Sequence, residues 1–228
     1  MKKILFLHGA LGSAQEMMPY VNALSEEYIC EAIDFPLHGN NASISEFTIA
    51  AFTDYLIFYI RQNCTEPVSI FGYSLGGYVA LYAAAKEPQL FDKILTLGTK
   101  FEWDKTFVEL QMQNIEADAM KAKTPHFVVS LSAMHQHIKW RKMLEETIYL
   151  MVHLAIKPNL TPEILQRIST KVLLGVGDKD SMVSLEETRK VNRSIAASNM
   201  FVLPRSSHPL ERTNVSVLLA ISRDFFKS

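Results

Sequence analysis

Ser74 is the residue whose surroundings point most clearly to chemistry. It lies between Gly72 and Gly76 in the sequence Gly-Tyr-Ser-Leu-Gly, at the end of an apolar run. A serine held on a sharp turn between a strand and a helix needs neighbours with little side chain, and glycine provides this on both sides. Residues 78–85 are typical of a helix, so a helix N-terminus would face a negative charge forming at Ser74. The pattern predicts a nucleophile for acyl transfer.

A serine nucleophile needs a base that takes the hydroxyl proton and a carboxylate that orients the base. His208 follows the last predicted strand, and Asp178 and Asp180 follow the strand before it. The carboxyl ends of parallel strands meet at one edge of a sheet, where ligands bind. Ser74, an aspartate and His208 are therefore expected at the same edge, although they are far apart in the sequence. Spacing alone does not choose between Asp178 and Asp180.

Six short apolar runs are expected to form the strands that position these residues. They alternate with helical patterns, which predicts a parallel sheet with helices on both faces. The runs cover residues 4–7, 28–33, 67–71, 93–97, 171–176 and 199–203, and a last helix is expected over residues 210–226. The predicted fold class is α/β: three α/β/α layers with a mostly parallel six-stranded sheet.

The alternation stops between residues 103 and 162. No strand candidate occurs there, and the helical segments are broken at Pro125 and Pro158. We interpret residues 103–162 as a helical cap inserted over the carboxyl edge of the sheet, and residues 1–102 and 163–228 as the α/β core.

Several residues near this insertion are candidates for a substrate pocket. Lys100, Phe101 and Trp103 follow the fourth predicted strand and are expected in the pocket wall. The insertion also holds Met112, Met120, Met134, Met143 and Met151. Methionine fills irregular gaps, so we expect these residues to pack in the interior, with some of them lining an adaptable acyl pocket.

Composition limits the possible partners. Hydrophobic residues make up 48% and charged residues 21% of 228 positions, with a net charge of −1. These values are typical of a globular protein and give no electrostatic reason to expect nucleic acid or an anionic membrane as a partner. The apolar run at residues 4–7 is too short for a secretory signal, and no stretch is long enough to span a membrane. A cytoplasmic protein with reduced cysteines, Cys30 and Cys64, is expected.

Metal and nucleotide binding find little support in the sequence. His135 and His137 are two residues apart, so on a helix they would not share a face. No glycine-rich phosphate-binding motif follows a predicted strand. We expect neither a metal nor a cofactor.

Taken together, these motifs resemble the α/β-hydrolase fold superfamily over nearly the whole chain. His8-Gly9 with Gly12 is similar to its oxyanion loop, and residues 72–76 are similar to its nucleophile elbow. Residues 34–39 are similar to its D-x-P-G-H-G turn, with Leu37 in place of the usual glycine. The order serine, aspartate, histidine is also that of the family.

The resemblance implies a role for each residue. Ser74 would be the nucleophile, His208 the general base and acid, and the backbone N–H groups of Ala10 and Leu75 the oxyanion hole. The family pattern G-x-x-D-x-x-V matches residues 177–183 and selects Asp180 as the acid.

The expected function is that of a carboxylesterase-like serine hydrolase acting on a small to medium carboxylic ester or a thioester through an acyl-enzyme on Ser74. Dehalogenases and epoxide hydrolases of the family use aspartate at the elbow, so Ser74 disfavours both. Two alternatives stay open: a cofactorless carbon–carbon hydrolase or lyase of the same fold, and a non-catalytic ligand-binding protein. The lyase branch usually carries arginine where this chain has Tyr78. No oligomeric state is predicted.

Overall fold

A single parallel sheet forms the centre of the molecule. The computed structural model describes residues 1–43 and 46–227, and within these the strand order is β2-β1-β3-β4-β5-β6. All neighbouring pairs are parallel. The strands are β1 (Lys3–Leu7), β2 (Ile29–Ile33), β3 (Val68–Tyr73), β4 (Phe91–Leu97), β5 (Lys171–Gly177) and β6 (Ser198–Leu203). The predicted six-stranded α/β fold is confirmed, and the sheet is entirely rather than mostly parallel.

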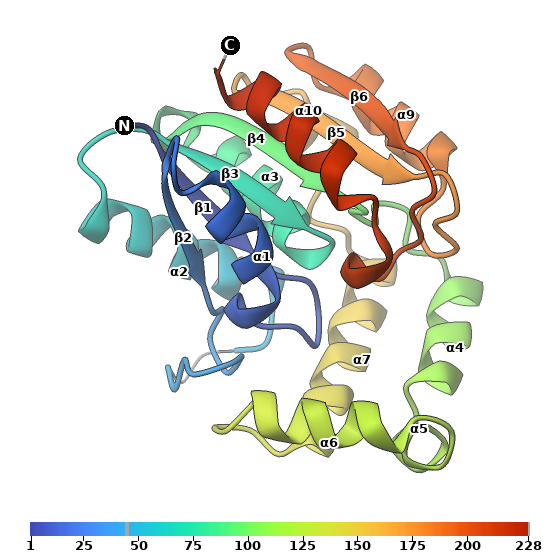
Figure 1. Cartoon of the computed structure of the whole chain (residues 1–228). Coiled ribbons are helices and arrows are strands. Elements are labelled where there is room, and N and C mark those ends of the chain that lie inside the picture. The colour runs from blue at the N-terminus through green and yellow to red at the C-terminus, as the bar shows by residue number, and fades with distance from the viewer. Residues whose placement is uncertain (44–45, 228) are drawn as a thin grey trace.

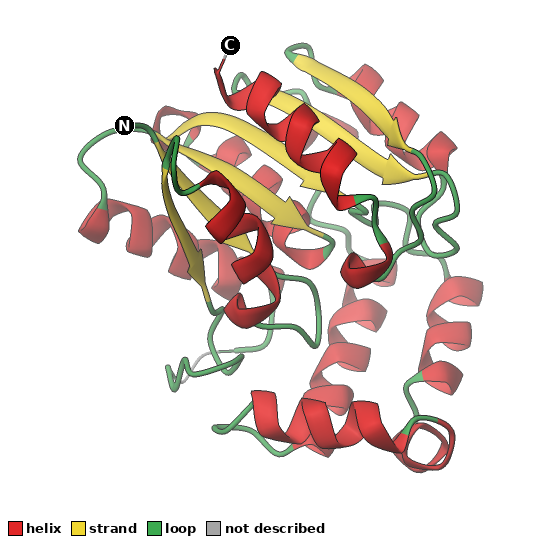
Figure 2. Cartoon of the chain, viewed as in Figure 1, coloured by secondary structure: helices red, strands yellow, loops and turns green. Residues whose placement is uncertain are grey.

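Helices cover both faces of this sheet (Figures 1 and 2). One face carries α1 (Ala14–Leu24) and α10 (Val215–Lys227). The other carries α2 (Ile49–Asn63), α3 (Leu75–Lys86) and α9 (Leu185–Ser194). Short helical turns at Pro88–Leu90 (η1), Pro162–Leu165 (α8) and Leu210–Arg212 (η2) complete the core.

The last helix starts later than the sequence pattern predicts. Residues Leu210–Arg212 form a separate 3₁₀ turn, and α10 begins only at Val215. The Thr213 hydroxyl donates a hydrogen bond of 2.7 Å to the carbonyl oxygen of Leu210. Such a side-chain bond to the backbone competes with helix formation, which explains the interruption.

The apolar core consists of two layers, one on each face of the sheet. In β1, Leu5 and Leu7 join the layer beneath α2 and α3, whereas Ile4 and Phe6 join the layer beneath α1 and α10. Successive side chains of a strand point to opposite faces, and here both faces are covered. All four side chains are buried, so the strand is a continuous apolar run in the sequence.

Four helices lie between β4 and α8, a stretch that is described throughout. They are α4 (Lys105–Asn114), α5 (Ala117–Lys123), α6 (Pro125–Met134) and α7 (Trp140–Ile156). We call residues 103–162 the insert. In Figure 1, α4 and α7 extend away from the sheet toward α5 and α6. Both prolines mark helix boundaries, since Pro125 opens α6 and α7 ends before Pro158.

Two further expectations concern membranes and cysteines. Within the described ranges, none of the helices combines the length and the apolar character that crossing a bilayer requires. Cys30 and Cys64 are both free, as expected.

Candidate active site

Ser74 lies at the junction of β3 and α3, where the chain turns sharply. Its φ is +49°, in the left-handed region that strains a residue with a side chain. The flanking glycines are required for space. A Cβ atom on Gly72 would lie 2.6 Å from the Cα of Gly77, and one on Gly76 would lie 2.4 Å from the carbonyl oxygen of Leu7. The turn therefore depends on the residue types from which it was predicted.

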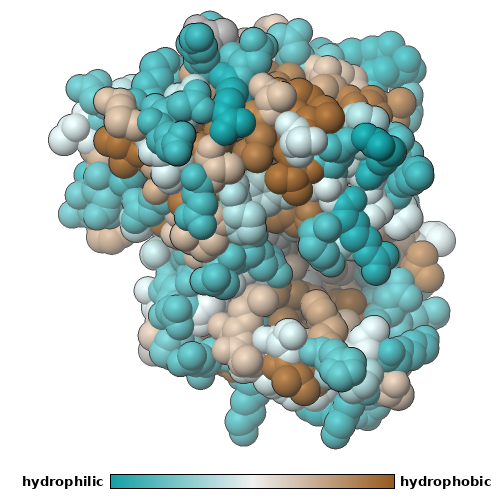
Figure 3. Space-filling model, in the orientation of Figure 1, coloured by the Kyte–Doolittle hydropathy of each residue, from teal (hydrophilic) through white to brown (hydrophobic). Residues whose placement is uncertain are grey.

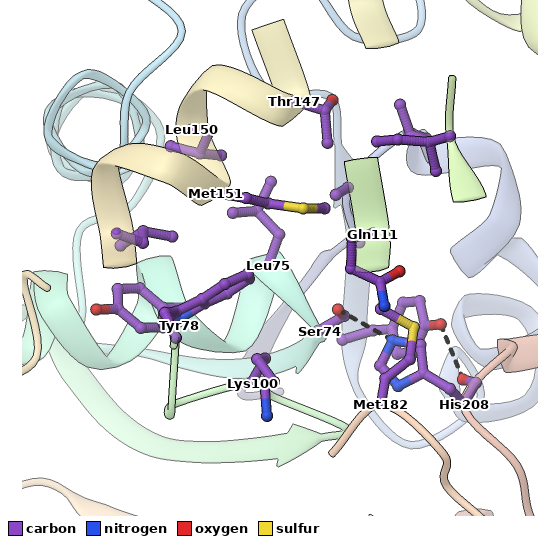
Figure 4. A pocket seen from close by; sticks show the side chains of 17 residues that line it. Ser74, Leu75, Tyr78, Lys100, Gln111, Thr147, Leu150, Met151, Met182 and His208 are labelled. Carbon is purple, nitrogen blue, oxygen red and sulfur yellow. Dashed lines mark hydrogen bonds between the residues drawn. The ribbon is translucent and has the colours of Figure 1, made fainter. Parts of the chain in front are cut away.

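The structure brings Ser74, His208 and Asp180 together in a hydrogen-bonded row. Ser74 Oγ lies 3.3 Å from His208 Nε2, the contact drawn as a dashed line in Figure 4, and His208 Nδ1 lies 2.9 Å from Asp180 Oδ2. A carboxylate can only accept, so Nδ1 carries the ring proton and Nε2 accepts from the serine hydroxyl. This arrangement can move a proton from Ser74 to His208 during attack on a carbonyl.

Asp180, and not Asp178, is the aspartate beside His208. Its Oδ1 accepts the backbone N–H groups of the residues two and three positions later, both at 2.9 Å. Burial by itself would raise the pKa of this carboxyl, but the hydrogen bond and charge of His208 and the two backbone donors outweigh it, so the pKa is lowered. Asp178 is used elsewhere, because its Oδ1 accepts the N–H of Ser206 at 2.9 Å.

Ala10 and Leu75 line the same cavity as Ser74. Leu75 is the first residue of α3, so the helix offers no acceptor for its N–H. Among the described residues, no acceptor receives the N–H of Ala10. Two unpaired donors next to a nucleophile can stabilise a developing oxyanion.

A cavity of about 220 Å³ opens beside Ser74, between the sheet edge and the insert. On the face shown in Figure 3, a recess separates the core from the insert, with hydrophobic residues along its lower rim. The predicted wall residues Lys100 and Trp103 line the cavity, but Phe101 does not. The N–H of Phe101 is bound to Glu187 Oε1 at 3.0 Å, and its ring packs near Tyr78, with the ring centroids 6.5 Å apart.

Two helices of the insert, α4 and α7, supply cavity-wall residues that the sequence analysis did not identify. Thr147, Leu150 and Met151 line it from α7 (Figure 4), and Leu154 of the same helix is also in its wall. Their spacing is that of one helix face, so a buried stripe was visible in the sequence, but not the cavity that it would line. Of the five methionines, Met151 is in this wall, whereas Met120 and Met143 pack in apolar clusters.

Polar groups in the cavity are few. Gln111 extends from α4 toward His208 and Met182 in Figure 4, and it is only 8% exposed. No residue in the described part of the chain is hydrogen-bonded to its carboxamide. The indole N–H of Trp103 is also buried without a partner in that part. Buried polar groups are normally hydrogen-bonded. The Gln111 carboxamide and the Trp103 indole N–H lack such partners, so each can form a hydrogen bond with a bound molecule.

The charge of Lys100 is neutralised inside the protein. Its Nζ lies 2.7 Å from Glu187 Oε2, and the two side chains are 11% and 1% exposed. Glu187 also accepts the N–H of Phe101 and caps α9 together with Ser184. The cavity wall next to Ser74 therefore carries a compensated ion pair rather than an unpaired cation.

Removing Glu187, the acidic partner of Lys100, should destabilise the fold. We expect Glu187→Ala to lower the free energy of unfolding by about 3 to 5 kcal/mol, because it leaves Lys100 charged, buried and unpaired. Urea unfolding would measure the change. Glu186→Ala is the matched control, since Glu186 is an exposed neighbour on the same helix and forms a surface ion pair with Arg189. Equal urea midpoints for the two variants would contradict this role of the buried pair.

Comparison with known proteins identifies the family of this chain. Residues 2–139 match the family model for the alpha/beta hydrolase fold. A pimeloyl-[acyl-carrier protein] methyl ester esterase from Neisseria meningitidis is 26% identical over 98% of this chain and 92% of its own length. A 2-succinyl-6-hydroxy-2,4-cyclohexadiene-1-carboxylate synthase from Yersinia pestis is 37% identical, but over only 36% of this chain and 29% of its own.

Solved structures show the same fold. A thermophilic esterase from Thermogutta terrifontis is similar with a TM-score of 0.76 and 19% identity, covering 100% of this chain and 90% of the other. At this identity the likeness concerns the architecture alone. Because the family model matches more than half of its residues, the chain belongs to the α/β-hydrolase fold family.

Proposed function

We propose that this protein is a serine hydrolase that cleaves a small to medium carboxylic ester, or a thioester, through an acyl-enzyme on Ser74. The main support is the row formed by Ser74, His208 and Asp180, which opens onto a mostly apolar cavity. Relatives named as esterases add to this support.

In the first half of the proposed reaction, Ser74 Oγ attacks the carbonyl carbon while His208 Nε2 takes its proton. The N–H groups of Ala10 and Leu75 stabilise the oxyanion of the tetrahedral intermediate. Collapse of the intermediate breaks the bond to the leaving alcohol or thiol, which receives the proton from His208. The leaving group then occupies an open groove that meets the cavity at Ala10, Tyr73 and His208.

In the second half, a water molecule enters from this groove and attacks the acyl-enzyme. His208 takes the water proton, and the oxyanion forms again in the same hole. Collapse releases the carboxylic acid and returns the proton to Ser74 Oγ. Asp180 holds the imidazole in the required tautomer in both halves.

We further propose that residues 103–162 act as a cap that selects the acyl group, on a core of residues 1–102 and 163–228. Support comes from the cavity wall, to which α4 contributes Gln111 and α7 contributes Thr147, Leu150 and Met151. Apart from Ser74 and His208, the polar side chains of the wall are few: Gln111, Thr147, the paired Lys100, the indole of Trp103 and the hydroxyls of Tyr73 and Tyr78. The remaining side chains are apolar, which suits an uncharged acyl chain.

The charge of the cavity disfavours the carbon–carbon alternative. The compound named in the Yersinia pestis synthase carries carboxylate groups. The strongest partners for such carboxylates are unpaired lysine or arginine side chains. Among the described lining residues, Lys100 is the only lysine or arginine, and Glu187 already neutralises it. An ester with an uncharged acyl group is the better match.

A two-part experiment tests the proposed function. Purified protein is treated with a fluorophosphonate probe and, separately, assayed on p-nitrophenyl esters of increasing acyl length. We expect Ser74 to be labelled, as mass spectrometry of the peptides would show, and hydrolysis to be fastest for a short or medium chain. A protein that is neither labelled nor active on any ester would instead be a ligand-binding member of the fold.

The acyl preference should depend on Met151. We expect Met151→Trp to narrow the cavity, which lowers kcat/KM more for longer acyl chains than for acetate. Tyr149→Trp is the matched control, because Tyr149 lies on the same helix but is 64% exposed. The measurement is kcat/KM across the ester series for both variants. A uniform loss at every chain length would indicate that Met151 does not contact the acyl chain.

A further inference from the structure

His135 connects the insert to two loops of the core. It follows the last residue of α6 and is only 2% exposed. Its Nδ1 lies 3.0 Å from the backbone N of Gly39, and its Nε2 lies 3.0 Å from the carbonyl oxygen of Leu11. Leu11 directly follows Ala10, one of the two proposed oxyanion donors. A side chain of the insert thus contacts the oxyanion loop itself.

The partners of His135 determine which ring nitrogen carries the proton. A backbone N–H can only donate, so Nδ1 accepts from Gly39 and is unprotonated. Nε2 then carries the proton and donates it to the carbonyl oxygen of Leu11. Burial lowers the pKa of His135, although the bond to Leu11 and the charge of Asp34 raise it in part. The buried imidazole of His38 also faces His135, with the ring centroids 5.6 Å apart.

The oxyanion loop needs support at this position. Leu11 has a φ of +61°, which is strained for a residue with a side chain, and such a conformation persists only where its surroundings impose it. The loop has one internal backbone bond of its own, from the N–H of Gly12 to the carbonyl oxygen of Gly9 at 3.2 Å. The carbonyl of Leu11 and the N–H of Gly12 belong to one peptide unit, and the carbonyl of Gly9 and the N–H of Ala10 belong to another. The bond from Gly12 to Gly9 therefore ties the peptide that His135 contacts to the peptide that carries the proposed oxyanion donor.

We propose that His135 is a positioning residue for the oxyanion hole. Through its bond to Leu11, the insert holds the N–H of Ala10 toward Ser74. This inference rests on the proposed function, because it assigns His135 to the stabilisation of an oxyanion at that serine. It also means that the insert takes part in catalysis and does not only shape the acyl pocket.

Two conservative variants separate the two hydrogen bonds of His135. In His135→Gln, the amide nitrogen can take the place of Nε2, so the bond to Leu11 is kept and the acceptor for Gly39 is lost. In His135→Asn, the amide oxygen can take the place of Nδ1, so the acceptor for Gly39 is kept and the bond to Leu11 is lost. Both remove one bond at the same buried position. His137→Gln is a control, since His137 is exposed nearby.

We expect His135→Asn to lower kcat for an ester by about ten- to a hundredfold with little change in KM, since full loss of one oxyanion donor reduces kcat by about a hundred- to a thousandfold. Binding of an alkyl trifluoromethyl ketone, which forms an oxyanion on serine, should weaken by a similar factor. His135→Gln should retain most of the parent kcat and most of the affinity for the ketone. A structural role alone would affect the two variants alike.

A measurement that does not depend on turnover completes the test. Amide hydrogen exchange of residues 9–13 should accelerate in His135→Asn and stay near the parent rate in His135→Gln. Equal kcat and equal exchange in the two variants would overturn the inference, even in an active esterase. If the parent protein is neither labelled by fluorophosphonate nor active on esters, the proposed function fails instead, and exchange alone then decides whether His135 holds the loop.

Discussion

Ser74→Ala should lower kcat for a p-nitrophenyl ester by about a millionfold, the size of effect expected when the nucleophile of a serine triad is removed. His208, Asp180 and the proposed oxyanion donors remain, but no acyl-enzyme can form without the hydroxyl. The fold should be unaffected. In the described structure, the hydroxyl of Ser74 is hydrogen-bonded to His208 alone, so its removal leaves no other group unpaired. Alanine also tolerates the positive φ at this position no worse than serine does.

Steady-state kinetics and labelling measure this effect together. Labelling by the fluorophosphonate probe should disappear in Ser74→Ala and persist in Ser132→Ala, a change at an exposed serine of α6. Thermal unfolding should show similar midpoints for both proteins. Substantial turnover in pure Ser74→Ala would remove Ser74 from the mechanism and leave only the architecture established.

Asp180→Asn should reduce kcat by about ten thousandfold. The amide of asparagine can donate to His208 Nδ1, which moves the ring proton to Nε2. Nε2 can then no longer accept the serine proton. The lowered pKa of Asp180 keeps the parent carboxylate ionised throughout the pH range of ester assays, so titration of this carboxyl should not reduce the parent rate within that range.

Asp178→Asn is the control for this prediction, since Asp178 binds the backbone of Ser206 and not His208. Its rate should stay close to that of the parent protein, with any change appearing in stability. Assaying both variants over a range of pH would decide between the two aspartates. If Asp178→Asn proved the more damaging change, the assignment of Asp180 would be wrong.

The sheet and its edge could be predicted from the sequence because their determinants are local. Strands buried on both faces are rich in apolar residues, as residues 4–7 of β1 are, and each observed strand begins and ends within two residues of its run. Once the strands are parallel, their carboxyl ends must meet. The convergence of Ser74 and His208 was therefore predictable without knowing any distance.

The contacts between the insert and the core were not predictable in the same way. Gln111 is a polar residue on α4, and His135 directly follows α6; polar residues at such positions are ordinarily expected to be exposed to solvent. Their burial results from tertiary packing, which local patterns do not encode: His135 is bonded to Gly39 and Leu11, and Gln111 lines the cavity. Phe101 was wrongly expected in the cavity wall because proximity in sequence to Lys100 does not determine which way a side chain turns.

The place where the insert joins the core has a further consequence. It leaves after β4 and returns at β5, and these two strands are hydrogen-bonded neighbours in the sheet. Lengthening or replacing the helices between them would leave the register of every strand intact, because loop closure depends only weakly on the length of the loop. Under the proposed cap role, laboratory evolution of a new specificity can start from this one segment, with the histidine that bridges it to the first loop retained.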